Sequence, residues 1–315
     1  MLIAARAFYM LSLLLCAGGA LFILATPSAA AVHAPLQRHV RRMSVLGVVA
    51  GIVYLAVTSA DLNGVTLPVL GAALQTAIAS ELGASIATAL FGLALIFSGQ
   101  GHRPALVWGG LILVVSSRAL TGHPVERDPA WLLMPAMAIH IACAAFWYGS
   151  LWPLFRSLRS LPHNDAAAVL REFSGAAMLA VAVLALVGLL TALVHLAAPS
   201  AVLNTWYGQL LIMKSTWFSV LLALAAWHKL RLTPRVEAGD ARALRVLRAS
   251  IVVEAIIMTL VILISVNLAS TEPETPPRNS PPAAASALTD TPCASGANAA
   301  HPDQWRRSAS TESQY

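Results

Sequence analysis

Long apolar stretches constrain this chain more than any other feature of its sequence. Apolar residues make up 58% of the 315 residues, charged residues only 11%, and the mean hydropathy is +0.72, which is far from the balance of a soluble domain. A helix that crosses a bilayer needs about 20 mostly apolar residues. The sequence therefore predicts an all-α, polytopic membrane helix bundle with about eight spans, near residues 3–26, 44–60, 71–98, 104–119, 130–153, 175–196, 208–228 and 250–269.

The positive charges predict how the bundle is oriented. Alternate loops hold 13 of the 20 Lys and Arg residues, namely Arg38, Arg41, Arg42, Arg103, Arg156, Arg159, Arg171, Lys229, Arg231, Arg235, Arg242, Arg245 and Arg248. The opposite loops are nearly bare of Lys and Arg. Because basic loops stay in the cytoplasm, we expect both termini to be periplasmic. The net charge of +6 is then an orientation signal and a surface for lipid headgroups, and we expect no nucleic-acid partner.

Two segments lie outside this simple pattern. The first span ends in "ATPSAAAVHA", which resembles a signal-peptidase site, but its apolar run is longer than a usual signal sequence and "RHVRR" follows it, so we expect the span to be retained. We treat residues 1–270 as the transmembrane domain. Residues 271–315 are rich in Pro, Ala, Ser and Thr and are predicted to be a disordered periplasmic tail.

The sequence contains no motif for nucleotide binding, since neither a GxGxxG nor a Walker A pattern occurs, and it has no CxxC pair. Its three cysteines, Cys16, Cys143 and Cys293, predict no disulfide framework. We expect no enzymatic activity. Function must then come from polar residues inside or beside the spans, where they are costly.

The stretch "MPAMAIHIACAAFWYGSLWP" in the fifth span carries the most informative polar pattern. On a helix, Met134, Met137 and His140 fall within about 120° of one another and climb about 9 Å along the axis. Trp147, seven residues after His140, returns to the same face, whereas Cys143 drifts away from it. Thioether sulfur and imidazole suit copper, with Cu(I) favoured over Cu(II). Methionine also fills apolar helices, so packing is the alternative for Met134 and Met137.

Other polar residues could extend this site. On the predicted outer side, His123 in "TGHP" and His195 at the end of the sixth span are further candidate ligands. A turn residue and a favourable contact with a helix dipole are their structural alternatives. The pathway candidates are Glu81, Lys214 and Trp147, and Glu254 lies farther inward. His228, beside Lys229 and Arg231, is most simply an anchor at the inner leaflet.

The order and spacing of these residues resemble the CopD (PcoD) family of copper-resistance membrane proteins over residues 118–269. The resemblance rests on a Gly-His pair, a His-x6-Trp-x-Gly-x-Leu pattern, a Phe-Ser pair and a Tyr-Gly pair followed by a helical Lys, here Gly122, His123, His140, Trp147, Gly149, Leu151, Phe173, Ser174, Tyr207, Gly208 and Lys214. Departures from the family pattern are Ser150 after Gly149, His228 where Asn is common, and the absence of an Arg late in the third span.

The resemblance implies copper uptake from periplasm to cytoplasm at the bacterial inner membrane, with copper homeostasis and resistance as its purpose. It also implies delivery by a periplasmic CopC-like copper-binding protein. A homo-oligomer is compatible with the sequence. Two alternatives stay open at this point: a b-type haem electron carrier with His140 and His195 as axial ligands, and a copper assembly or sensing partner that transports nothing.

Overall fold

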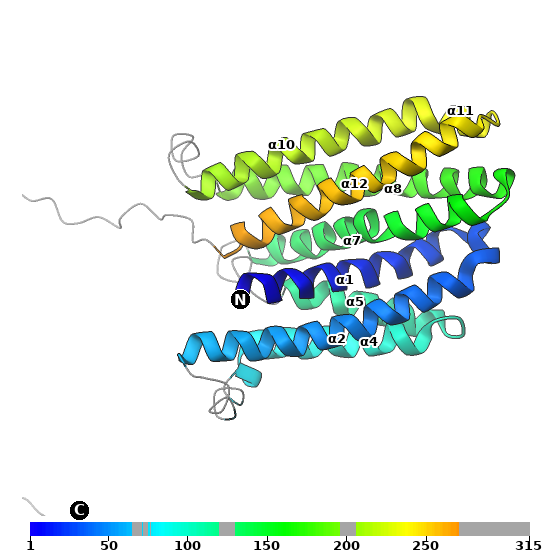
Figure 1. Ribbon diagram of the computed structural model, residues 1–315. Helices are drawn as coiled ribbons and strands as arrows, with labels where there is room; N and C mark the ends of the chain where they lie inside the picture. The colour runs from blue at the N-terminus through cyan, green and yellow to red at the C-terminus, as the bar shows by residue number, and fades with distance from the viewer. Residues whose placement is uncertain (65–70, 72–74, 76, 120–129, 196–205, 271–315) are drawn as a thin grey trace, which may run out of the picture. The chain divides into compact units, whose positions relative to one another are not determined.

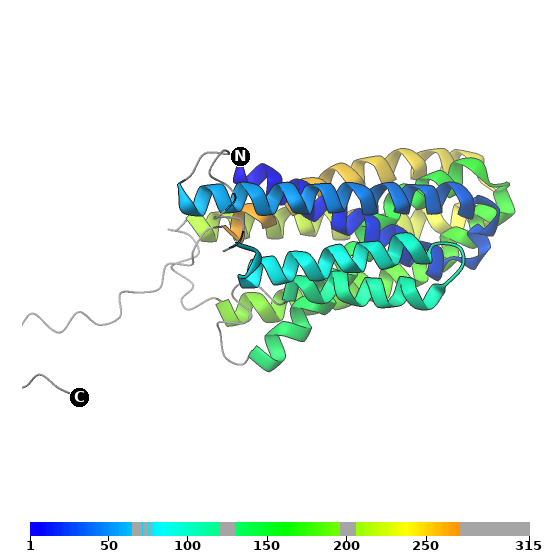
Figure 2. The same ribbon diagram turned by 90° about the horizontal axis from the view of Figure 1, so that it is seen from below.

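The computed structural model describes residues 1–64, 71, 75, 77–119, 130–195 and 206–270, and its regular elements there are all helical (Figures 1 and 2). The predicted tail, residues 271–315, lies outside the described residues. Long helices lie side by side and alternate in direction along the chain. They are α1 (Leu2–Ala25), α2 (His33–Asn63), α4 (Glu81–Gly99), α5 (Pro104–Ala119), α7 (Ala130–Ser160), α8 (His163–His195), α10 (Trp206–Trp227) and α12 (Ala241–Leu268). Shorter elements are the 3-10 turn η1 (Pro27–Val32), the π-helical turn η3 (His228–Leu232) and α11 (Thr233–Glu237).

The length and composition of these helices fit a bilayer. Seven of the described helical segments are long and apolar enough to cross a membrane, and α5 is a shorter apolar helix. Large apolar side chains face outward along the bundle, for example Leu179, Leu186 and Ile112, as expected where lipid replaces water. The prediction of an all-α polytopic membrane bundle is confirmed, with α5 as its shortest predicted span.

Several helices are longer than the predicted spans, because a hydropathy window detects only the apolar part of a helix. Helix α2 begins at His33 instead of 44, α8 at His163 instead of 175 and α12 at Ala241 instead of 250. Each of these helices therefore continues beyond its apolar run into a basic or polar segment. The third span begins at Glu81, not 71, after the Ser80 hydroxyl accepts a hydrogen bond from the Gly83 amide.

The start of α12 is fixed by a side-chain cap. The Asp240 carboxylate accepts hydrogen bonds from the backbone amides of Ala243 and Arg242, at 3.1 and 2.8 Å, which satisfies two otherwise unpaired donors of the first turn. These bonds hold the pKa of the Asp240 carboxyl below its ordinary value. The cap is therefore complete above the ordinary carboxyl pKa and is lost as the pH falls through the lowered one.

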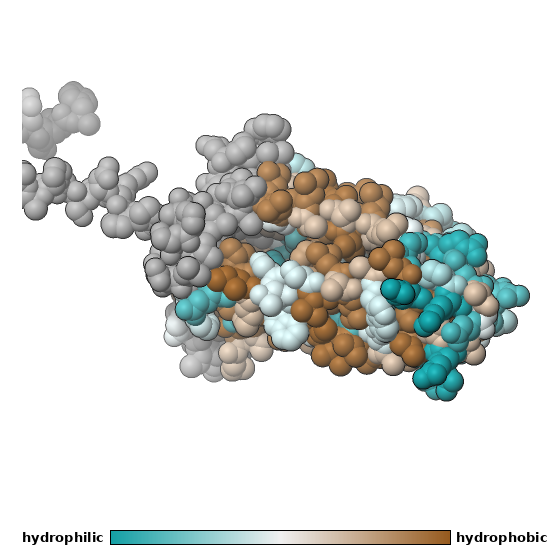
Figure 3. Space-filling model, turned by 90° about the horizontal axis from the view of Figure 1, so that it is seen from above, coloured by the Kyte–Doolittle hydropathy of each residue, from teal (hydrophilic) through white to brown (hydrophobic). Residues whose placement is uncertain are grey.

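The basic residues gather at one end of the bundle, where α1 joins α2, α4 joins α5, α7 joins α8 and α10 joins α12. We call this the basic end. In Figure 3 hydrophilic side chains cluster there, and a broad hydrophobic band covers the middle of the visible face. The other end holds the starts of α1 and α7 and the end of α12, where the Arg6 guanidinium donates to the Ala269 carbonyl and the Ser270 hydroxyl. The charge asymmetry predicted from the sequence is thus present in space.

Helix α1 packs in the centre of the bundle, against α2, α7 and α12. Its contact with α7 is close because glycines face each other: a Cβ on Gly18 would overlap the Ala145 carbonyl, and one on Gly149 would overlap the Leu14 carbonyl. The Ser150 hydroxyl donates to the Gly18 carbonyl at 3.2 Å. Small residues allow such close backbone approach in membrane helices, so Gly149 positions α7, the helix that carries the candidate ligands.

We expect Gly149→Val to lower the free energy of unfolding by about 1–3 kcal/mol, because the added side chain has no space beside α1. The matched control is Gly175→Ala on α8, where a Cβ meets nothing within 4 Å. Thermal unfolding in detergent micelles measures both variants. An unchanged midpoint for Gly149→Val would show that the α1–α7 contact is looser than described.

Candidate functional site

The predicted ligand stripe lies in the half of α7 that is remote from the basic end. Met134, Met137 and His140 are all half-buried on this helix, and Cys143 is half-buried and carries a free thiol. Pro135 lies between the two methionines inside the helix. A proline there removes one backbone hydrogen bond and bends a helix, and a second proline, Pro153, lies in the other half of α7.

The His140 ring lies between α7 and α8. A Cβ built on Gly188 of α8 would be 3.9 Å from His140 Cε1, which is an ordinary packing distance. The His140 Nδ1 atom is buried and has no hydrogen-bond partner among the described residues. Lys214 of α10 is near enough for its charge to act on the His140 ring. An imidazole nitrogen that is buried without a partner costs free energy and is free to bind a ligand.

The structure does not assemble a complete metal site. His123 lies outside the described residues, and only the backbone of His195 is described, as the last residue of α8. No group of three or more His, Cys, Asp or Glu side chains that could hold a metal occurs among the described residues. His123 and His195 therefore stay predicted ligands, and the haem hypothesis based on His140 and His195 stays a hypothesis.

Glu81, a predicted pathway residue, is exposed as the first residue of α4. A negative charge at that position interacts favourably with the helix dipole, which gives Glu81 a structural explanation. The structure places it apart from the described surroundings of His140.

A second polar group, which the sequence did not single out as a unit, lies deeper in the bundle. Glu254, near the middle of α12, is only 3% exposed. The indole Nε1 of Trp147 on α7 donates to Glu254 Oε1 at 2.6 Å, and His228 Nδ1 lies 3.3 Å from Glu254 Oε2. The other ring nitrogen of His228 hydrogen-bonds the Ser250 hydroxyl. We call these four residues, Trp147, His228, Ser250 and Glu254, the buried polar cluster.

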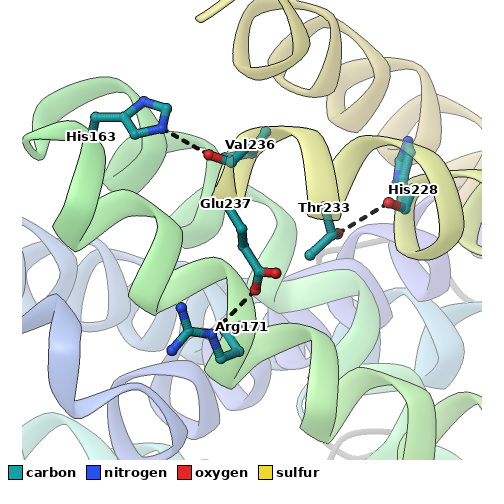
Figure 4. A network of polar contacts seen from close by, with 6 residues as sticks. All are labelled: His163, Arg171, His228, Thr233, Val236 and Glu237. Carbon is teal, nitrogen blue, oxygen red and sulfur yellow. Dashed lines mark hydrogen bonds and ion pairs between the residues drawn. The ribbon is translucent and has the colours of Figure 1, made fainter. Parts of the chain in front are cut away.

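The backbone around His228 is as unusual as its side-chain contacts. His228 opens the π-helical turn η3, and its carbonyl accepts a hydrogen bond from the Thr233 hydroxyl at 3.0 Å, as Figure 4 shows. Single π-helical turns are rare and frequently occur at functional sites. The turn widens the helix where α10 ends and brings His228 against α12.

Polar contacts at the basic end hold this turn against α8. His163 Nε2 is 2.8 Å from the Val236 carbonyl, and Arg171 Nε donates to Glu237 Oε1 at 3.1 Å (Figure 4). Both contacts link the start of α8 to α11, which follows η3 directly. The position of His228 is therefore fixed from α8 as well as from α12.

A cavity of about 360 Å³ adjoins the buried polar cluster. Apolar side chains of α7, α8, α10 and α12 form most of its wall, and Trp147, His228 and Glu254 line it together with Lys229 and Thr233 of the basic end. Leu230 of η3 also lines the cavity and is 72% exposed. The cavity thus extends from the middle of the bundle to its surface near the basic end.

Sequence reasoning assigned Trp147 and His228 mainly structural roles and named Glu254 only as a pathway residue. One signal could have found the cluster: Glu254 is the only acidic residue in the long apolar helix 241–268. A carboxylate at such depth requires donors from neighbouring helices. The donors themselves could not be identified, because they lie 107 and 26 residues away in the chain.

We expect Trp147→Phe to lower the stability of the protein by about 1–2 kcal/mol, because Glu254 would lose its indole donor while most of the ring packing is kept. Trp206→Phe, at an exposed position, is the control and should leave the unfolding midpoint unchanged. Thermal unfolding in micelles measures the difference. Equal midpoints for the two variants would show that the indole bond contributes no stability.

Comparison with known proteins relates part of the chain to a family. The family model described as "Copper resistance protein D", CopD, matches residues 167–268, which include most of α8, all of α10, His228 and Glu254 but not α7. The "Copper transport protein CutJ" of Bacillus subtilis (strain 168) is 31% identical over 157 residues, covering 47% of this chain and 28% of that protein. The "Inner membrane protein YebZ" of Escherichia coli (strain K12) is 31% identical over 109 residues, covering 34% of this chain and 37% of that protein.

This chain therefore spans well under half of the length of either relative. No solved structure matches it at a significant level. The predicted localisation as a multi-pass inner-membrane protein agrees with the seven apolar helices and with the name of the second relative. The family match lies within the region of the resemblance found in the sequence, residues 118–269, and this part of the chain is similar to the CopD family.

Proposed function

We propose that this protein binds copper at the end of α7 that is remote from the basic end and moves it across the inner membrane, from periplasm to cytoplasm. Copper is the transported substrate, and uptake would serve copper homeostasis and resistance. The proposal assigns no catalytic reaction to the chain. The ligands are Met134, Met137 and His140, with His123 and His195 as further predicted ligands.

The observation that carries this proposal is the buried His140 Nδ1, which has no hydrogen-bond partner among the described residues. It lies on the same helix as two half-buried methionines at intervals of three residues. Imidazole and thioether together suit Cu(I) better than they suit Mg²⁺ or Ca²⁺, which prefer oxygen ligands. Cu(I) is therefore favoured over Cu(II) as the bound form.

The proposed orientation rests on the basic end, and the direction of transport is the one that the resemblance implies. Positively charged segments of membrane proteins stay in the cytoplasm, so the basic end would face inward and the ligand stripe would face the periplasm, with both termini there. A periplasmic CopC-like protein would then deliver copper to the stripe. From His140, copper would pass toward Trp147, about 10 Å farther along α7 at 1.5 Å per residue, with Lys214 and Glu81 as other pathway residues.

The names of the relatives support the chemistry, since one is called a copper transport protein and the family description concerns copper resistance. Because each relative is much longer than the matched region, transport by this chain stands as a proposal. Assembly into homo-oligomers is compatible with it, and the lipid bilayer is the environment of all the apolar helices.

Cells that express His140→Ala should accumulate copper no faster than cells without the protein, because the proposed site loses its nitrogen ligand, whereas wild-type expression should raise cellular copper. His102→Ala, which removes an exposed histidine at the basic end, should behave like wild type. Copper is measured by mass spectrometry of washed cells. Copper levels that respond neither to expression nor to the substitution would exclude uptake through this site.

Experiments on the purified protein distinguish copper binding from haem binding. A Cu(I) competition titration should give weaker binding for the Met134/Met137/His140 triple alanine variant than for wild type. An absorption spectrum with a Soret band that disappears in His140→Ala would support the haem electron carrier instead. Copper binding that depends on His140 without uptake would support the assembly or sensing alternative.

The proposed orientation predicts the location of a reporter enzyme. Alkaline phosphatase, which is active only in the periplasm, should be active when fused after Ser270 and inactive when inserted after Gly239, in the turn between α11 and α12. The first site follows the end of α12, and the second is at the basic end. The opposite result would invert the direction of transport.

A further inference from the structure

Glu254 is an ionisable group held inside a membrane bundle by polar partners that leave it connected to a cavity. Its two oxygens are engaged separately, Oε1 by the Trp147 indole and Oε2 by His228 Nδ1. Trp147 is 2% exposed and Glu254 is 3% exposed. A carboxylate at this depth is costly unless it is paired, and among the described residues its ion-pair contact is with a histidine, which can bind a proton.

The cavity connects this pair to the surface near the basic end. Besides Glu254 and His228, Lys229, Thr233 and Leu230 line it, and Leu230 is 72% exposed. Its remaining wall is mostly apolar, so the pair is the polar end of a narrow apolar space. A cavity of about 360 Å³ has room for several water molecules, because one occupies about 30 Å³ in the liquid, and Ser250, Thr233 and Ser174 provide hydroxyl groups nearby.

The charged and titratable groups around Glu254 are few. Of the residues that line the cavity, His228 and Lys229 are titratable, and those contributed by α8 are uncharged. From α7, Tyr148 faces α12 and hydrogen-bonds Thr259. In α11, Glu237 is paired with Arg171. In α1, Arg6 contacts the far end of α12, while Tyr9 and Cys16 contact α2. Among the described residues, His228 is therefore the titratable group in contact with the Glu254 carboxylate, and Lys229 lines the same cavity.

The geometry points to a proton-binding site at the Glu254–His228 pair, which exchanges protons with the aqueous phase at the basic end through the cavity. A proton that enters is bound by the Glu254 carboxylate, or by the His228 ring where that ring is neutral, and leaves by the same route. When the carboxylate becomes a neutral carboxyl group, its attraction to an imidazolium ends and its bond from Trp147 weakens.

This site also has a physical connection to the proposed copper ligands, and the connection rests on the proposed function. Trp147 bonds Glu254 and lies on the same helix as His140, seven residues away. A change in the Glu254–Trp147 bond therefore acts on the helix that holds the ligand stripe. Binding of a proton at Glu254 from the basic end therefore makes copper movement depend on the pH of that side.

The proton site is tested without copper by infrared difference spectroscopy of the purified full chain during a pH titration. Wild type should show a carboxyl C=O band that grows as Glu254 binds a proton and is absent in Glu254→Gln, which keeps an oxygen acceptor for Trp147. Glu237→Gln, which removes a glutamate from an ion pair at the basic end, should retain the band. If the spectrum of Glu254→Gln contains every carboxyl band of the wild-type spectrum, the proposal is overturned.

A second variant keeps the glutamate. In His228→Gln the Glu254 carboxylate loses the imidazole that contacts Oε2, so the pH at which the Glu254 band appears should differ from that in wild type. An unchanged titration would show that the two groups are not linked. The titration of His228→Gln tests the contact between Glu254 and His228 even if Glu254→Gln is too unstable to purify.

Coupling is tested by copper uptake into proteoliposomes with and without an imposed pH gradient. Wild-type uptake should change several-fold with the gradient, and Glu254→Gln should lose this component. Gradient-independent uptake in wild type, or an unchanged response in Glu254→Gln, overturns the coupling. Absence of wild-type uptake in every condition refutes the proposed function and the coupling with it, whereas the infrared titration still decides the proton site.

Discussion

A carboxylate in the middle of an apolar helix cannot be left without partners in a bilayer, and Glu254 shows how this protein meets that requirement. Trp147 and His228 reach it from two other helices, one contact for each oxygen. These bonds tie α7, α10 and α12 together at one depth. Apolar surface cannot provide this specificity, because lipid tails are as apolar as the side chains they replace. The cavity beside Glu254 and the π-helical turn at His228 both adjoin this contact.

Helix α7 connects the two polar sites of the protein, the buried polar cluster and the predicted copper ligands. Close packing of Gly149 on α1 fixes its middle, and Trp147, two residues earlier, meets the buried carboxylate. His140 and the methionines lie farther along the same helix, in the half that contains Pro135. One helix therefore carries both the predicted copper ligands and Trp147 of the buried polar cluster, and it contains a proline in each half, Pro135 and Pro153.

The sequence was sufficient for features that depend on local composition. Apolar runs predict the helices, and the spacing of Arg residues predicts the basic end. Helix ends were harder, because Ser80 and Asp240 set them by capping outside the apolar runs. The half-buried position of His140 follows the predicted stripe, but its unpaired nitrogen could not be foreseen. His228 was interpreted as a membrane anchor since its partners, Glu254 and Ser250, belong to the next long helix. Contacts between helices depend on how the bundle packs, which residue spacing along one helix does not encode.

The central claim is that copper binds to the sulfur and nitrogen ligands of α7. X-ray absorption spectroscopy of the protein loaded with one Cu(I) tests it most directly, because scattering from sulfur and from an imidazole ring can be distinguished. The account predicts mixed sulfur and imidazole scattering, with the imidazole contribution reduced in His140→Ala. A spectrum that contains only oxygen ligands, or one that is identical in wild type and His140→Ala, would contradict it.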